Sequence, residues 1–227
     1  NLGLSASYDD LRTLDSASSS LKKQSGEFSE LAASYGLKRD TRNRAFMPTS
    51  GSVMSFDQSI PIYADKNFIS NNFKSSVYNS LTENVIGAGK ISISAINGID
   101  DDVRLSKRKS LSSKNLRGFK KGKVGPVDGT DHVGGNYAAA LNFEASLPNL
   151  LPESTKTDIG LFFDIGNVWG VDYDSSLDDS NKIRSSTGAA ASWISPLGPM
   201  TFIISTNLSK ASTDETESFN FNLGTTF

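Results

Sequence analysis

The sequence predicts an all-β chain, and three observations support this fold class. Hydrophobic and polar residues alternate with a period of two in many segments, whereas the i, i+3, i+4 spacing of an amphipathic helix is almost absent. Most of these segments are about 10 residues long, which suits a tilted strand that crosses a bilayer. The connections between them alternate between short and long. Because a transmembrane β-barrel and a soluble β-sandwich both produce such alternation, periodicity alone leaves the two folds open.

Composition excludes several classes of protein. Of the 227 residues, 37% are hydrophobic, and no uninterrupted apolar run approaches the roughly 18 residues of a transmembrane helix. A formal charge of −2 gives no overall attraction to nucleic acid. The chain has no cysteine and a single histidine, His132, which argues against thiolate sites and paired-histidine zinc sites. With no phosphate-binding glycine motif either, we expect no enzyme activity, cofactor or metal.

The clearest alternation lies in two segments of the second half of the chain. In residues 136–147, bulky apolar side chains occupy one face and Glu144 lies on the other. In residues 157–169, Phe163 belongs to an apolar face and Asp164 to the opposite one. A charged side chain facing lipid is unfavourable, so a barrel would point both carboxylates into its lumen.

Eight further segments complete a sheet of about ten expected strands. They lie near residues 1–9, 28–39, 51–61, 68–79, 83–96, 183–194, 199–209 and 217–227. In the last segment the bulky residues Phe219, Phe221, Leu223 and Phe227 lie opposite Asn220, Asn222 and Gly224.

The connections differ in length on the two sides of the expected sheet. The links near 80–83 and 195–199 are tight, whereas those at 10–27, 96–135 and 170–182 are long and polar. This asymmetry is typical of outer-membrane barrels, with the long loops outside the cell if the C-terminus is periplasmic. The longest connection, 96–135, is expected to contain no strand, and a structureless loop of that length is usually functional or disordered.

Several motifs in and around this connection occur in a specific order. The tetrapeptide Leu116-Arg117-Gly118-Phe119 is followed by Gly125-Pro126 and Gly134-Gly135-Asn136. This set resembles a loop of the BamA family of outer-membrane assembly factors and its surface-antigen superfamily, although Leu116 stands where valine is common. The resemblance extends over nearly the whole chain through the stretches at 39–42, 46–51, 162–169, 183–186 and 193–199 and the C-terminal alternation ending in Phe227.

The resemblance implies a sixteen-stranded antiparallel transmembrane barrel preceded by periplasmic POTRA domains. Residues 1–227 would supply its last ten strands, without the POTRA domains and first strands, as an open curved sheet with edges at 1–9 and 217–227. The loop at about 97–135 would fold into the lumen, and the strand at about 217–227 would form one side of a lateral gate. The expected location is the outer membrane of a Gram-negative (diderm) bacterium.

The resemblance also implies roles for particular residues. Arg117 would pair with acids on the barrel wall, and Glu144 and Asp164 occupy the matching positions. A guanidinium with five donors suits such a bridge between two acceptors. Gly118 would allow a close backbone approach, and Phe119 would anchor the loop tip. The gate strand and terminal signal would comprise Phe219, Phe221, Leu223, Gly224 and Phe227.

These expectations lead to one preferred function and two alternatives. The preferred function is an insertase component that folds other barrels into the outer membrane without bond chemistry. Its implied partners are unfolded barrel clients, outer-membrane lipid and the other subunits of an assembly complex, mainly lipoproteins that bind the POTRA domains. The alternatives are a secretion pore of the same superfamily, of the two-partner or autotransporter assembly type, and a passive porin or adhesin.

Overall fold

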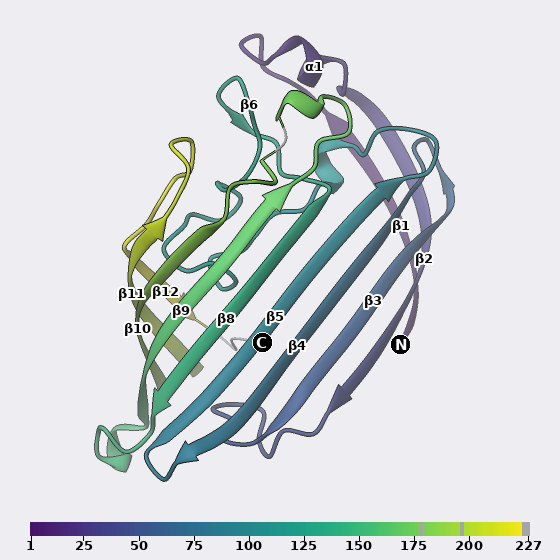
Figure 1. The fold of residues 1–227 in the computed structure, drawn as a ribbon. Coiled ribbons are helices and arrows are strands. Elements are labelled where there is room, and N and C mark those ends of the chain that lie inside the picture. Colours follow the sequence, from purple (N-terminus) through teal and green to yellow (C-terminus); the bar gives the residue numbers. More distant parts are fainter. Residues whose placement is uncertain (178, 196–197, 224–227) are drawn as a thin grey trace.

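The computed structural model describes residues 1–177, 179–195 and 198–223. Within this part of the chain, ten strands form one antiparallel sheet in the order β1-β2-β3-β4-β5-β8-β9-β10-β11-β12 (Figure 1). Their bounds are β1 Leu2–Leu11, β2 Gly26–Asp40, β3 Gly51–Ala64, β4 Phe68–Thr82, β5 Val85–Gly98, β8 Tyr137–Leu147, β9 Thr157–Trp169, β10 Arg184–Ser195, β11 Gly198–Ser209 and β12 Phe219–Leu223. Each strand pairs with its neighbour along the chain, apart from β5, which pairs with β8.

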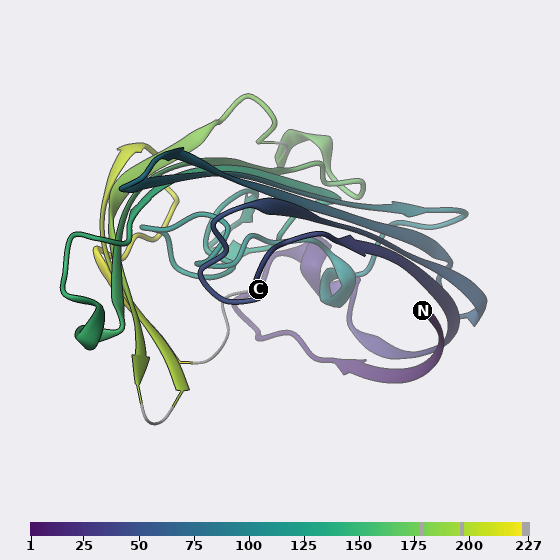
Figure 2. The same cartoon turned by 90° about the horizontal axis from the view of Figure 1, so that it is seen from below.

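The sheet is strongly curved and open. Seen along its strands, it bends around a concave side that holds the chain between β5 and β8 (Figure 2). Strands β1 and β12 form its two edges in the described part of the chain. An antiparallel sheet of ten strands that curves without closing confirms the predicted fold class, a partial barrel. No helix among the described residues is long and apolar enough to cross a membrane.

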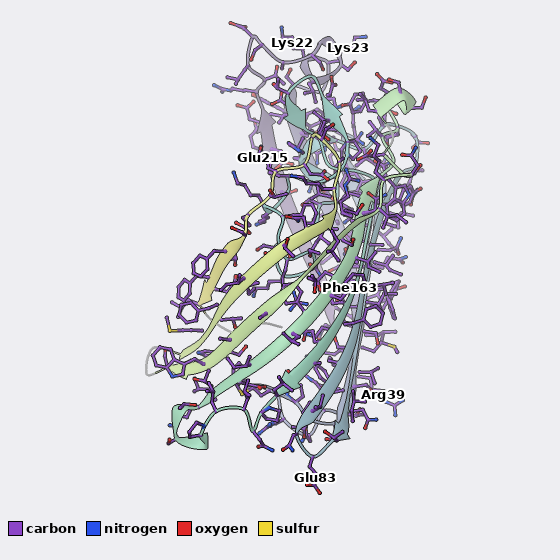
Figure 3. The ribbon with its side chains drawn as sticks, turned by 60° about the vertical axis from the view of Figure 1, so that its left-hand side comes forward. Lys22, Lys23, Arg39, Glu83, Phe163 and Glu215 are labelled. Carbon is purple, nitrogen blue, oxygen red and sulfur yellow. The ribbon has the colours of Figure 1, made fainter. Side chains whose placement is uncertain are left out.

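Period-two alternation decides which side chains face the concave side. In β9, Phe162 and Asp164 are buried on the concave side, whereas 55% of Leu161 and 37% of Phe163 are exposed on the convex side (Figure 3). The convex face therefore carries large apolar side chains along the whole sheet, as a lipid-facing surface does. They include Leu37, Ile62, Val77, Ile93, Leu141, Phe143, Leu161, Phe163, Ile204 and Phe219.

The two ends of the sheet differ as the connection lengths predicted. The long connections 12–25, 99–136 and 170–183 lie at the end that carries Lys22 and Lys23, and Glu83 marks the opposite end, where β4 turns tightly into β5 (Figure 3). Connections 41–50 and 65–67 depart from this pattern: the first is long although it lies at the Glu83 end, and the second is short although it lies at the other. The connection between β1 and β2 contains a single helical turn, α1 (Ser19–Lys22). Short 3-10 turns occur at Leu105–Lys107, Glu153–Thr155 and Ser175–Leu177.

The expectation that the connection at 96–135 has no strand was wrong. It contains a small hairpin in which β6 (Val127–Asp128) pairs with β7 (Asp131–His132). Gly129 supplies the positive φ of +64° that the tight turn between them requires. Because each strand has only two residues, no alternation pattern could have indicated it.

Residues 99–136, the inner loop, fill the concave side of the sheet and create the main core of the molecule. The loop runs from β5 to β8 and lies against the inner face of β8 and β9 (Figure 2). Apolar side chains of the loop pack there against small side chains of the sheet's concave face, which is called the wall from here on. This cluster consists of Leu111, Leu116, Phe119, Val124, Ala138, Ala140 and Val168. This packing determines where along β8 and β9 the tetrapeptide Leu116–Phe119 lies.

Candidate functional site

Arg117 reaches the wall of the sheet through a double contact with Asp164. Its Nε donates to Asp164 Oδ2 at 2.7 Å and its Nη2 donates to Asp164 Oδ1 at 2.6 Å. The backbone N–H of Arg117 donates to the same Oδ2 at 3.0 Å. Asp164 is fully buried, so this carboxylate has exchanged water for donors of the loop. A two-point guanidinium–carboxylate pair also defines the orientation of the loop.

Glu144 on β8 completes the acid pair. Arg117 Nη1 lies 2.8 Å from Glu144 Oε1, and Lys90 on β5 lies 2.8 Å from the other oxygen of the same carboxylate. Asn142 bridges the loop and the wall, because its amide donates to Asp164 Oδ1 and to the carbonyl of Asn115, each at 2.8 Å. The structure thus brings together Arg117, Glu144 and Asp164, the three residues that were expected to pair.

An aromatic ring completes the environment of the Arg117 guanidinium. Its central carbon lies 3.8 Å from the centre of the Phe162 ring, within the range of a cation–π contact. Burial acts to lower the pKa of Arg117, but the hydrogen bonds to Asp164 and the charge of Glu144 act in the opposite direction, and the pKa is raised overall. Arg117 therefore remains charged, and the site works as a fixed electrostatic clamp.

The tetrapeptide residues beside Arg117 have distinct positions. Leu116 and Phe119 are each 1% exposed and belong to the core under the inner loop. Gly118 has a φ of +89° and lies against the inner faces of β10 and β11. The Ser186 hydroxyl donates to the carbonyl of Arg117, and the Asn207 amide donates to the carbonyl of Gly118 at 3.0 Å. The loop backbone is therefore held by four strands of the wall, β8 to β11.

We expect Gly118→Ala to destabilise the docked loop by about 2–3 kcal/mol. A Cβ there would lie 3.1 Å from Asn207 Nδ2 and 3.2 Å from Ser205 Oγ, at a φ that L-residues rarely adopt. Gly122→Ala is the matched control, because Gly122 also has a positive φ, +69°, but open space around its Cβ position; we expect about 1 kcal/mol there. Urea titration with limited proteolysis of the loop measures both, and equal effects would contradict a close approach at Gly118.

A second polar cluster holds the first part of the inner loop. The Arg108 guanidinium is paired with Asp172, which follows β9, and Asn136 donates to the other oxygen of this carboxylate at 2.9 Å. The N–H of Val103 also donates to Asp172, at 2.8 Å. Burial acts to raise the pKa of Asp172, but these hydrogen bonds outweigh it and the pKa is lowered. The loop is thus anchored to the wall at two places, through Arg108 and through Arg117.

A third cluster, centred on Arg184, was not predicted as a site. Arg184 is fully buried; its Nε and Nη2 each donate to a different oxygen of Asp214 at 2.9 Å. The same guanidinium pairs with Asp179 and donates to Asn167 Oδ1 at 2.6 Å. This cluster ties the start of β10 to the connection between β11 and β12. Its only sequence signal was the position of Arg184 within the motif at 183–186.

The predicted gate strand lies at one edge of the sheet. In β12, Phe219, Phe221 and Leu223 point to the convex side, and the rings of Phe221 and Phe202 are 5.0 Å apart. The other two residues predicted for this strand, Gly224 and Phe227, lie outside the described residues. No group of three or more His, Cys, Asp or Glu side chains in the described part of the chain could hold a metal ion.

Sequence reasoning missed several partners of the tetrapeptide. Asn142 shares the polar face of β8 with Glu144, so its inward direction could have been read from the alternation. Phe162 also falls on the inward face of β9, but nothing in the sequence indicated that a guanidinium would cover it. Ser186 and Asn207 belong to strands whose height relative to the loop only the folded sheet defines.

Comparisons with known proteins support the resemblance. The outer membrane protein assembly factor BamA of Neorickettsia risticii is 27% identical over 238 residues, which cover 100% of this chain and 31% of that protein. BamA of Neisseria meningitidis is 32% identical over 140 residues, which cover 50% of this chain and 18% of that protein. A crystal structure of BamA from Haemophilus ducreyi lacking POTRA domains 1–3 superposes with a TM-score of 0.86 at 23% identity, over 97% of this chain and 49% of that one.

These matches confirm the resemblance to BamA that the motifs predicted. In each of these curated relatives the chain spans less than a third of the length. A family model described as the Omp85 superfamily domain matches residues 1–227. Because this match extends over the whole sequence, the chain belongs to the Omp85 superfamily.

Proposed function

We propose that this chain is part of an insertase that folds and inserts β-barrel proteins into the outer membrane of a Gram-negative bacterium. The last strand, β12, would form one side of a lateral gate at which a client strand pairs. Unfolded barrel clients, outer-membrane lipid on the convex face and other subunits of an assembly complex are its proposed partners. The work would be done by binding and strand pairing, without bond chemistry.

One observation carries the proposal: at the edge of the described sheet, the ladder between β12 and β11 stops at Ile204↔Phe219, although β11 continues to Ser209. Among the described residues β12 pairs with β11 over five positions, from Met200↔Leu223 to Ile204↔Phe219, whereas β10 pairs with β11 over nearly the whole length of both strands. The unpaired N–H and C=O groups of an edge strand are a template for a further strand. A short edge strand that is held by few ladder pairs is suited to exchange its neighbour for a client strand.

The inner loop supports this function over a passive pore. It fills the concave side of the sheet, and the clamp at Arg117 fixes it to the wall. Porin interiors are water-filled channels, whereas other outer-membrane barrels are plugged by loops, and the inner loop favours the second kind. The relatives named above carry the description outer membrane protein assembly factor, which agrees with the proposal.

Deleting residues 217–227 from the full-length protein is expected to abolish assembly of client barrels. The deletion removes β12 and hence the edge to which a client strand would add. Assembly into liposomes is measured on gels as the fraction of the client that migrates in the compact, folded form when the sample is not heated. Normal client assembly after the deletion would refute the proposal.

A companion variant tests the same edge without truncation. Because the Ser205 N–H donates to the Ser218 carbonyl, the alternation of an antiparallel ladder directs the N–H of Phe219 away from β11. Phe219→Pro therefore removes a donor from the free edge and spares the β11 ladder. We expect it to slow client assembly, whereas Phe219→Leu, which keeps the N–H, should not.

A further inference from the structure

The last strand leaves its neighbour well before that neighbour ends. Strand β12 follows β11 as far as Ile204↔Phe219, and the Ser205 N–H then donates to the carbonyl of Ser218 at 2.9 Å. Strand β11 continues to Ser209, where it pairs with β10. Extending the observed register would place Glu217 opposite Thr206 and Glu215 opposite Leu208. The residues before β12 do not take these positions.

Residues 215–217 pair with the inner loop instead. The Glu217 N–H donates to the carbonyl of Gly118 at 3.1 Å, and Phe119 and Thr216 form an antiparallel bridge. Two further backbone hydrogen bonds continue this antiparallel pairing toward the start of the segment. The N–H of Lys120 donates to the carbonyl of Glu215 at 3.0 Å, and the N–H of Glu215 donates to the carbonyl of Lys123 at 3.1 Å. The backbone of the short segment that leads into the last strand therefore pairs with the loop that carries the tetrapeptide, while β11 keeps a side-chain contact to it, from the Ser205 hydroxyl to the Glu217 carbonyl at 3.2 Å.

The distribution of charge explains why the loop is the better partner. Along β12 the odd-numbered residues face the convex, apolar side, as Phe219 and Phe221 do. A continued ladder would place Glu215 on that face beside Leu208, which is 59% exposed there. On the loop, the same carboxylate lies 3.1 Å from Lys120 and 3.1 Å from Lys123. Pairing with the loop thus places the Glu215 carboxylate beside two lysines and keeps it off the apolar convex face.

The wall and the loop are also bonded to each other at this point. The side-chain amide of Asn207 on β11 donates to the carbonyl of Gly118. Asn207 belongs to the part of β11 with which a longer β12 would otherwise pair. At the start of the segment, Asp214 is held by Arg184 on β10. The segment 214–217 is consequently fixed to the wall through Arg184 and Ser205 and to the loop through its backbone, and the last strand starts after one intervening residue, at Phe219.

We propose that the inner loop is the strand partner of residues 215–217 and thereby determines where the last strand separates from β11. The inference deepens the proposed function, since it makes the loop a positioning element for the edge that a client would meet. While Arg117 holds the loop on the wall, the last strand stays short. When the loop leaves the wall, residues 215–217 become available to β11 and the ladder lengthens.

A pair of competing cross-links tests this partner exchange. Residues 1–227 contain no cysteine. Any cysteine elsewhere in the full-length protein is first replaced by serine, so that the introduced pairs report without background. In the full-length protein in outer-membrane vesicles, we expect Lys120→Cys/Glu215→Cys to form a disulfide at least about tenfold faster than Leu208→Cys/Glu215→Cys, because the bond needs Cα atoms roughly 4.4–6.8 Å apart. Both pairs remove the Glu215 carboxylate alike, so the comparison reports the backbone pairing of residues 215–217 with the loop and not the ion pairs. Equal rates, or a faster reaction of the pair at 208 and 215, would overturn the proposal.

Releasing the loop is expected to reverse this preference. Adding Arg117→Ala should slow the cross-link between positions 120 and 215 and accelerate the one between positions 208 and 215. Asn207→Ala is the milder variant, since it removes one bond to Gly118 and leaves the clamp intact, and it should shift the ratio in the same direction. If both backgrounds leave the ratio unchanged in protein that migrates in the compact form, the loop does not position the last strand.

The cross-link readout is independent of client assembly. Suppose that the disulfide between positions 120 and 215 forms faster, as expected, but that client assembly is unimpaired after deletion of 217–227. This result would refute the insertase proposal and leave the pairing of residues 215–217 with the loop intact. Conversely, loss of the preference with the deletion still blocking assembly would remove the positioning role and keep the insertase. The two proposals can therefore fail separately.

Discussion

Replacing Arg117 with alanine is expected to release the inner loop from the wall and to lower the free energy of unfolding by about 3–5 kcal/mol, the usual cost of removing one partner of a buried ion pair. The reason is the state in which the substitution leaves Asp164. This carboxylate is 0% exposed and would lose both guanidinium donors. The backbone N–H of residue 117 leaves with the released loop, so Asn142 of the wall is the donor that stays. Urea titration in detergent measures the stability, and limited proteolysis of residues 99–136 measures the release of the loop.

Two controls separate charge from geometry. Arg117→Lys keeps the positive charge but cannot donate to both oxygens of Asp164 and reach Glu144 at once, so we expect an intermediate loss. Lys121→Ala lies on the same loop at an exposed position and should change the stability by less than about 0.5 kcal/mol. A loop that stays protease-resistant in Arg117→Ala would show that the apolar cluster around Phe119 holds it without the clamp.

Replacing Arg184 with alanine is expected to lower the free energy of unfolding by a similar amount, about 3–5 kcal/mol, through the separate cluster that Arg184 forms with Asp214. Arg184 and Asp214 are both 0% exposed in their side chains. The substitution would leave Asp214 charged in the interior, without the two guanidinium donors and with the Ala211 N–H, at 2.6 Å, still bonded to it. The connection between β11 and β12 should then become susceptible to protease, because Asp214 no longer fixes it to β10. Hydrogen exchange of residues 211–217 measures the same loosening directly.

A paired substitution shows whether the cost arises from the unpaired charge. Arg184→Met combined with Asp214→Leu removes both charges and should recover part of the stability that Arg184→Ala loses, since no buried carboxylate of that pair remains. Lys210→Ala, at an exposed position of the same connection, is the matched control and should be near neutral. If Arg184→Ala proves as stable as Lys210→Ala, the cluster is not a structural tie.

Much of this architecture could be predicted from the sequence because it is encoded locally. The expected strands at 136–147 and 157–169 correspond to β8 and β9 within one residue at each end. Alternation also assigned the faces of Glu144 and Asp164, since in a strand successive side chains must point to opposite sides. The identity of Arg117 as their partner came from the motif around it, because a loop residue has no periodicity that could indicate its contacts.

Only the tertiary structure decided which segments that are distant along the chain contact each other. Arg117 and Asp164 are separated by 47 positions, and Arg184 and Asp214 by 30, so their meeting depends on the stagger of several strands at once. The partner exchange of residues 215–217 depends in addition on a loop that must already be docked. The sequence by itself determined the strands and their faces, because a period of two and the cost of a charge in lipid act on each strand separately. The class of barrel came from the motifs that resemble the BamA family, since the same alternation also fits a β-sandwich. Register and loop placement arise from packing across the whole sheet, and the structure alone reveals them.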